Sequence, residues 1–230
     1  MSYSNTRVKV PKLHDGCGHG INDSVTLKPV TGGVGDDDLV STSSHFLKKR
    51  GRGLGYSEHR IVHEEPIRIE KLKGGVSLIT VSAWRNGAGA ATGGVGFMLS
   101  SKAHGGISLI KPYGSRVPNI SFNGNPRLTA ITAYSPTEAA SAEEAEDFHN
   151  TLRQAIADVP AHHLLLVLGD MNARLGQESA GDRRWYFHPC TNRIGELLRD
   201  TAQECCMDIT NTRFRFDGTL RKGQLDFILI

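Results

Sequence analysis

The sequence predicts an α/β fold, and three observations support this prediction. Short apolar runs typical of strands occur from about residue 76 onward, and an amphipathic helical pattern lies between two of them. The apolar run after that helix is too short to form a helix of its own. Strand, helix and strand in this order indicate a parallel crossover, in which ligands gather beyond the carboxyl ends of the strands.

Composition and charge narrow the class of protein without choosing a function. The 230 residues are 38% hydrophobic and 22% charged, which fits one globular domain with or without an appendage. The net charge of +3 permits a polyanionic partner without requiring one. No apolar run approaches the roughly 20 residues that span a bilayer, and the N-terminus does not resemble a secretory signal. Four cysteines are too few for a disulfide framework, so we expect an intracellular protein, nuclear or cytoplasmic.

The first 55 residues differ in composition from the rest of the chain. They contain nine of the 26 glycines, an acidic triplet at Asp36–Asp38 and a basic run at Lys48–Arg50. Such a segment buries little apolar surface. We therefore predict a poorly ordered arm over residues 1–55, with a short helix around Leu39–Lys49, and a packed domain over residues 56–230.

Two pairs of strands open the predicted domain. Residues 76–84 and 94–100 are apolar runs joined by a glycine-rich stretch, which we interpret as a flexible connection rather than a phosphate-binding loop. Residues 117–122 and 127–134 flank the sequence Asn-Gly-Asn-Pro, whose residues favour a tight turn. The second pair is the strongest hairpin signal in the chain.

A capping box and a helical repeat predict the crossover helix over residues 142–157. Ser141 and Glu144 form the box. Apolar residues then recur at helical spacing at Ala145, Phe148, Leu152, Ile156 and Val159. The LLLVLG run that follows predicts a strand buried on both faces, a further helix fits residues 193–204, and QLDFILI predicts a last strand.

The predicted topology brings Tyr134 and Asp170 to one edge of a sheet, because each ends a parallel strand. In GDMNA, Asp170 could bind a hard cation or orient a water, and Asn172 could donate to a phosphate oxygen. A purely structural Asp-Asn turn is an equally common interpretation. Asp226 lies inside an apolar strand and must face a polar site or solvent, and Glu58 is an ordinary surface charge unless a partner lies near it.

In order along the chain, seven stretches together resemble the endonuclease/exonuclease/phosphatase superfamily. The similarity is closest to the endonuclease domains of LINE-type (non-LTR) retrotransposons, which accompany reverse transcriptases, and to craniofacial development protein 2-like proteins. It covers most of the chain from about Tyr56 to Ile230. The stretches are SEHRIVHEEPI, LITVSAWRNGAGAATGGVGFML, NPRLTAITAYSPT, LLLVLGDMNARLG, TNRIGELLRD, ITNTRF and QLDFIL.

This resemblance implies a four-layered α/β sandwich, in which two β-sheets pack face to face with helices outside. It also implies hydrolysis of phosphodiester bonds in DNA with Mg²⁺ or Mn²⁺. The implied roles are a metal ligand at Glu58, a phosphate contact at Tyr134, water activation at Asp170, a phosphate hydrogen bond at Asn172 and support of a catalytic histidine at Asp226. Trp84, Arg85 and Asn86 would line the nucleic-acid surface.

The sequence also departs from the family pattern. Ser57 stands where the family has glutamine, and residues 1–55 contain no convincing equivalent of the first strand with its metal-site asparagine. The sequence ends at Ile230, before a Ser-Asp-His element. We therefore expect an incomplete sandwich with weak or no activity. A non-catalytic binding or vestigial protein, and another phosphatase of the superfamily, are the alternatives.

Overall fold

The computed structural model describes residues 53–72, 74–176, 188–213 and 226–230. The strands of the four-stranded sheet are β1 (Gly53–Ser57), β6 (Val95–Leu99), β3 (Ser77–Val81) and β2 (Arg68–Lys71), in that order. The five-stranded sheet has the order β11 (Asp226–Leu229), β10 (His163–Asp170), β9 (Arg127–Tyr134), β8 (Val117–Phe122) and β7 (Ile107–Tyr113). The remaining elements are the small pair β4 (Trp84–Arg85) and β5 (Ala91–Thr92), the helices α2 (Ser101–Gly105), α3 (Ala142–Ala157) and α4 (Arg193–Glu204), and the 3₁₀ turn η1 (Thr210–Arg213).

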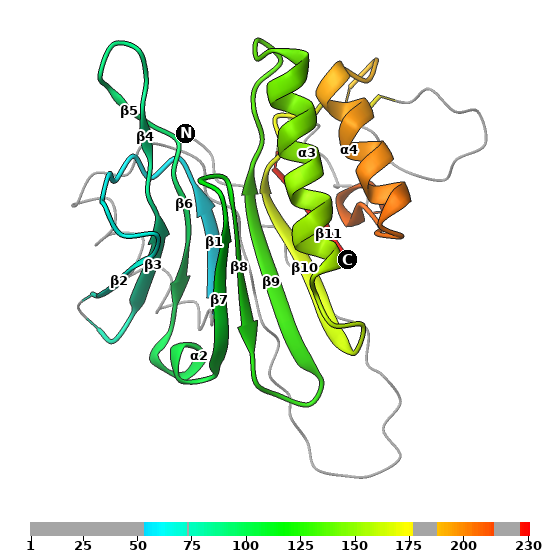
Figure 1. Cartoon of the computed structure of the whole chain (residues 1–230). Coiled ribbons are helices and arrows are strands. Elements are labelled where there is room, and N and C mark those ends of the chain that lie inside the picture. Colours follow the sequence, from blue (N-terminus) through cyan, green and yellow to red (C-terminus); the bar gives the residue numbers. More distant parts are fainter. Residues whose placement is uncertain (1–52, 73, 177–187, 214–225) are drawn as a thin grey trace, which may run out of the picture.

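The two large sheets pack face to face, and α3 and α4 cover the outer face of the five-stranded sheet (Figure 1). Ile79 and Phe97 of the four-stranded sheet meet Ile120 and Ala130 of the other sheet in a buried cluster. Phe148 and Leu152 of α3 and Ile194 and Leu198 of α4 fill a second cluster against β8, β9, β10 and β11. The predicted α/β sandwich is confirmed, and the described residues contribute three of its layers. None of the described helices has both the length and the apolar character that a membrane span requires.

The five-stranded sheet follows the prediction closely. β8 and β9 form the expected hairpin, and β9 pairs with β10 in parallel with Tyr134 opposite Asp170. β11 adds to the other side of β10, antiparallel, with Asp226 opposite Asp170. Both helices have the predicted bounds, and Ser141 accepts a hydrogen bond from the Glu144 amide at 3.1 Å. The crossover therefore brings the carboxyl ends of β9 and β10 to one edge of this sheet, where the start of β11 lies beside them.

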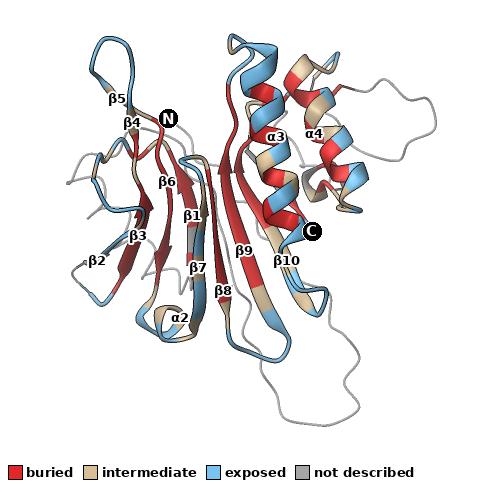
Figure 2. Ribbon diagram, in the orientation of Figure 1, coloured by how far each residue is buried: buried red, intermediate tan, exposed pale blue. Residues whose placement is uncertain are grey.

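The burial of β10 corrects one prediction. Its second half, Val167–Asp170, is buried, but Leu164 is 43% exposed. Figure 2 shows that the first half of this strand extends beyond the end of α3, so solvent reaches it there. A strand buried on both faces is thus correct only for the half that leads into the predicted site.

The four-stranded sheet differs more from the prediction. β1 begins at Gly53, inside the segment assigned to the arm, and pairs antiparallel with β6. The glycine-rich connection between β3 and β6 contains the small pair β4–β5, and in its turn the Asn86 side chain accepts hydrogen bonds from the amides of Ala88 and Ala90 at 3.1 and 2.9 Å. Residues 1–52, including the predicted helix around Leu39–Lys49, lie outside the described residues.

Candidate active site

Tyr134 joins the two sheets at the edge where β9 ends. Its hydroxyl donates a hydrogen bond to Glu58 Oε1 at 2.6 Å. Burial raises the pKa of Tyr134 well above its ordinary value, and the hydrogen bond to Glu58 raises it further. The hydroxyl therefore stays protonated at neutral pH and acts as a hydrogen-bond donor, directed towards the carboxylate that the family resemblance implies as a metal ligand.

The turn that carries Glu58 is held by the next residue, His59. Glu58 and Arg60 both adopt left-handed backbone conformations, with φ of 59° and 60°. The buried His59 ring accepts a hydrogen bond at Nδ1 from the Ile61 amide at 2.9 Å, so the proton is on Nε2, which donates to the carbonyl of Val81 at 2.9 Å. Burial lowers the pKa of His59 to about 4, so the ring is neutral at pH 7. Sequence reasoning did not identify this residue.

Asp170 and Asn172 occupy the adjoining end of β10. Asp170 is 7% exposed, and its Oδ1 accepts a hydrogen bond from the Asn172 amide at 2.9 Å. Asn172 has φ of 46°, and its Nδ2 donates to the carbonyl of Ser135 at 2.8 Å. The Asp-Asn turn suggested by sequence is thus present as local structure. The same turn places both polar side chains beside Tyr134, so the two interpretations do not exclude each other.

The structure therefore brings together Glu58, Tyr134, Asp170 and Asn172, which lie up to 114 residues apart in sequence. The backbone of Asp226 lies beside Asp170 in the sheet, but its side chain is outside the described set. No described group of three or more His, Cys, Asp or Glu side chains could hold a metal ion. Mg²⁺ is often bound through one or two carboxylates together with water and substrate phosphate. Glu58 fits that kind of weak site.

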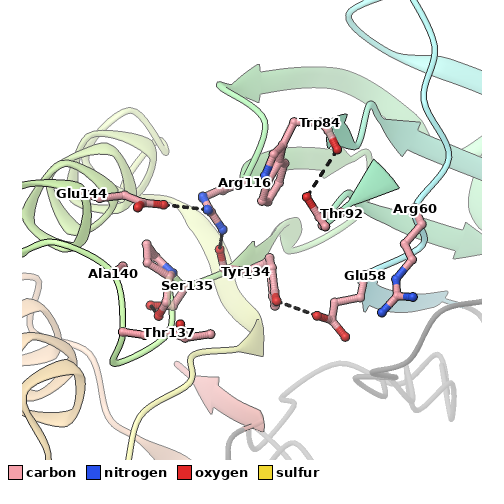
Figure 3. Close-up of a pocket in the computed structure, with 13 residues that line it drawn as sticks. Glu58, Arg60, Trp84, Thr92, Arg116, Tyr134, Ser135, Thr137, Ala140 and Glu144 are labelled. Carbon is pink, nitrogen blue, oxygen red and sulfur yellow. Dashed lines mark hydrogen bonds and ion pairs between the residues drawn. The ribbon is translucent and has the colours of Figure 1, made fainter. Parts of the chain in front are cut away.

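A pocket of about 340 Å³ opens next to Tyr134 (Figure 3). Its lining combines cations, aromatic rings and hydroxyl groups, and it includes Glu58, Arg60, Trp84, Thr92, Arg116, Tyr134, Ser135, Thr137 and Glu144. Asp170 and Asn172 are not among the lining residues, so the pocket adjoins their edge without containing it. Such a cavity offers a partly aromatic surface beside the polar edge of the sheet, with the two arginines matched in number by the two glutamates.

Arg116 is the central side chain of this pocket, and sequence reasoning missed it. Its guanidinium lies 4.1 Å from the centre of the Trp84 ring and donates to Glu144 Oε1 at 2.8 Å. Burial lowers the pKa of Arg116 from its ordinary value, while the Glu144 carboxylate raises it. The sequence places Arg116 immediately before the predicted strand that pairs with β9, and this was the only signal. In the structure, the Arg116 carbonyl accepts a hydrogen bond from the Tyr134 amide at 3.1 Å.

The three residues predicted to line a nucleic-acid surface separate in the structure. Trp84 lies in the pocket, with its ring 6.3 Å from the Tyr134 ring. Arg85 is exposed and donates to the carbonyl of Gly89 at 2.9 Å. The side-chain oxygen Oδ1 of Asn86 accepts hydrogen bonds from the amides of Ala88 and Ala90 in its own turn. Their role in binding stays a prediction, and Trp84 is the one that lies beside the candidate site.

Curated relatives resemble part of the chain. Craniofacial development protein 2 from Bos taurus is 28% identical over 149 residues, which cover 59% of this chain and 25% of that protein. The protein of the same name from Tragulus javanicus is 27% identical over 149 residues, covering 26% of its length. The chain thus spans about a quarter of the length of the curated relatives it matches. No protein-family model matches it.

Solved structures resemble most of the chain. The endonuclease domain of the telomere-specific non-LTR retrotransposon TRAS1 superposes with a TM-score of 0.56 at 11% identity, covering 88% of this chain and 82% of that one. The 3′ phosphatase NExo from Neisseria, bound to a product DNA hairpin, gives 0.61 at 13% identity, covering 88% and 85%. An AP endonuclease from Archaeoglobus fulgidus gives 0.57 at 13% identity, with the same coverage of 88% and 85%. The resemblance read from the sequence is confirmed, and the chain has the fold of the endonuclease/exonuclease/phosphatase proteins.

Proposed function

We propose that this chain is a divalent-metal-dependent phosphodiesterase that cuts DNA internally. The observation that carries the proposal is the 2.6 Å hydrogen bond from Tyr134 to Glu58, which brings a carboxylate of one sheet to the edge where Asp170 and Asn172 end a strand of the other. Similar solved structures include an endonuclease domain and a 3′ phosphatase bound to product DNA, which supports a nucleic-acid substrate.

The residues at this edge match the charge changes of phosphodiester hydrolysis. Attack of water on phosphorus breaks the bond to the leaving oxygen and increases negative charge on the phosphate oxygens. Tyr134 stays protonated, and its single proton, which it donates to Glu58 in this structure, would turn to one of these oxygens when phosphate binds. Asn172 uses one amide N–H on Ser135 and has a second to offer, because a carboxamide has two donors.

Asp170 is the group that would orient the attacking water and accept its proton. Its side chain is largely buried and is oriented by the Asn172 amide. Glu58 would hold Mg²⁺ or Mn²⁺, which when bound neutralises charge on the phosphate. Because Glu58 is the one described carboxylate that we assign to the metal, we expect weak Mg²⁺ binding. Calorimetry should show that Glu58→Gln abolishes this binding, and tight binding that survives the substitution would contradict the assignment.

A nicking assay on supercoiled plasmid DNA tests the function. With MgCl₂ or MnCl₂ we expect the relaxed circle to accumulate, and Asp170→Asn should lower the rate by about 100-fold or more. Asp147→Asn is the matched control, since it makes the same change on the exposed face of α3. The weak activity expected from the sequence is measured directly as the rate of the unmodified chain.

The same assay separates the alternatives. DNA binding without cleavage in either metal would replace the proposed activity with a binding function. Release of phosphate from a 3′-phosphorylated oligonucleotide, with no nicking of the plasmid, would indicate a phosphatase. Equal nicking by the chain and by Asp170→Asn would point to a contaminating nuclease and would remove the support for this site.

A further inference from the structure

The start of α4 contacts both loops that leave the candidate active site. Asn192, which precedes the helix, accepts a hydrogen bond at Oδ1 from the Gly195 amide at 2.9 Å, as a helix cap does. The same oxygen accepts from the Arg174 amide at 2.8 Å. Its Nδ2 donates to Glu138 Oε2 at 2.7 Å. One side chain thus connects a helix to two separate loops.

These two loops are the ones that carry the candidate site. Arg174 is two residues beyond Asn172, and Glu138 is four residues beyond Tyr134. The loops also touch each other where Asn172 donates to the Ser135 carbonyl at 2.8 Å. Asn192 therefore lies behind this contact and ties its two sides to the same helix.

Asn192 makes more hydrogen bonds than a helix cap requires. Asp and Ser cap helices about as well as Asn, because a cap needs only an acceptor. The Arg174 amide donates to the same Asn192 Oδ1 that caps the helix. The Glu138 carboxylate accepts from Asn192 Nδ2, and an aspartate in place of Asn192 would have no such donor. Loss of about an ångström of alignment in an active site is enough to slow a reaction severely.

We propose that Asn192 is a positioning residue, which holds the loops of Tyr134 and Asn172 in register through its simultaneous bonds to Glu138 and Arg174. The inference rests on the proposed function for its effect on rate. The alignment of the two loops is a property of the folded chain and can be measured without any activity.

A swap of two side chains tests this role. Asn192→Asp keeps the helix cap and the bond to Arg174, but it sets two carboxylates against each other where a 2.7 Å hydrogen bond stood. Glu138→Gln alone still offers an acceptor to Asn192. In the double variant, the carboxamide introduced by Glu138→Gln can donate to the carboxylate introduced by Asn192→Asp, which restores the bond with reversed polarity.

We expect Asn192→Asp to lower kcat for plasmid nicking by about 10-fold with little change in KM, and the double variant to recover to within about two-fold. Glu138→Gln alone should have a small effect. A loss of rate in Asn192→Asp that the double variant does not recover, or no loss at all, would overturn the proposal. A purely structural contribution would follow the melting temperature and would not separate kcat from KM.

Nuclear magnetic resonance provides a readout that does not depend on catalysis. The side-chain amide signals of Asn172 should shift in Asn192→Asp and return in the double variant. If the unmodified chain does not nick DNA, the proposed function fails while these signals still decide the role of Asn192. Unchanged Asn172 signals in Asn192→Asp would exclude the positioning role whatever the activity.

Discussion

The two sides of the candidate site are built in different ways. On the five-stranded sheet, Tyr134 and Asp170 sit opposite each other in regular parallel pairing, so the ladder of backbone hydrogen bonds sets their separation. On the four-stranded sheet, Glu58 lies just beyond β1 in a turn with left-handed backbone. That turn is held by one buried ring, His59, bound to the carbonyl of Val81, and by few backbone hydrogen bonds, such as that from the Arg60 amide to the Gly93 carbonyl at 3.0 Å.

This difference has a physical consequence for how each side responds to change. In paired strands, many backbone hydrogen bonds together fix the positions of the residues. The backbone of one strand cannot move without disturbing the rest of the sheet. A turn held by a few bonds, one of them made by a buried side chain, can adjust when that side chain rotates, but it loses alignment when the side chain is lost. Two glycines, one on each side, allow this contrast to be measured.

Gly169→Ala should have the largest effect on stability. Gly169 has φ of 148°, and a Cβ there would lie 1.9 Å from the Ala133 carbonyl oxygen in the paired strand. We expect a loss of about 3 kcal/mol or more in the free energy of unfolding, because the clash is with backbone and the conformation is strained. Urea unfolding measures it.

Gly94→Ala makes the comparison on the other side. Gly94 has φ of 88°, and a Cβ there would lie 2.4 Å from the His59 ring, which is a side chain and can shift. We expect a smaller loss, about 1–3 kcal/mol. Gly105→Ala is the control, since its Cβ would meet nothing within 4 Å. A loss at Gly94 larger than that at Gly169 would contradict the contrast.

The same contrast explains what the sequence could predict. The helix at residues 142–157 carries a capping box and a helical repeat, and the hairpin before it carries a turn sequence, so local signals specify the five-stranded side. Those signals also placed Tyr134 and Asp170 on one edge. The Asn172 contact to Ser135 then follows from the turn after β10.

The four-stranded side offers weaker local signals. β1 has the sequence GLGYS, whose glycines resemble a loop, and β2 has the polar sequence RIEK with three exposed residues. The five-stranded sheet has one such strand too: its edge strand β7 contains Pro112 and several exposed side chains, so it lacks a clear alternation. His59 and Arg116 gain their roles only from residues far away in sequence, which a reading of the neighbouring sequence does not detect.

Each side of the molecule contains a buried histidine that should make stability depend on pH. Burial lowers the pKa of His59 to about 4, and burial also lowers that of His149, between α3 and α4, to about 4. An unfolded histidine has a pKa of about 6.5, so the unfolded chain binds more protons between these values. Stability is therefore complete above about pH 6.5 and falls as the pH decreases towards 4.

Each histidine should contribute up to about 1.4 kcal/mol per pH unit within that window. We expect His59→Gln and His149→Gln each to lower the slope measured by urea unfolding between pH 6.5 and 5, and by similar amounts. The slope, rather than the stability at one pH, is the readout, because each substitution also destabilises the chain at pH 7. A slope unaffected by His59→Gln would show that this ring can be protonated without disturbing the turn.

Tyr134→Phe tests the bond that joins the two sides. The substitution removes the single hydroxyl proton that Tyr134 donates to Glu58 at 2.6 Å in this structure and that we propose turns to the phosphate when substrate binds. We expect nicking to slow by about 10- to 100-fold. Tyr113→Phe is the matched control, because it also removes a tyrosine bond to a carboxylate, at 2.7 Å to Asp158, on the same sheet and away from the site. Equal slowing by both variants would indicate a general loss of structure.

The smallest expected effect is on DNA binding. It is tested with two arginines, one at each end of the β8–β9 hairpin. Arg116 lies in the pocket beside Tyr134, whereas Arg127 begins β9 at the opposite edge and is exposed. If the pocket binds a DNA phosphate, Arg116→Met should lower the slope of log affinity against log salt by about 1.

Arg116→Lys keeps the charge, so it should preserve that slope while weakening binding a few-fold, because lysine cannot lie flat over the Trp84 ring 4.1 Å away. Arg127→Met should leave both quantities unchanged. Fluorescence anisotropy with a duplex oligonucleotide at several salt concentrations measures them. An equal change of slope for Arg116→Met and Arg127→Met would mean that DNA contacts the basic surface in general. A change confined to Arg116 would assign the contact to the edge where the two sheets meet at Tyr134 and Glu58.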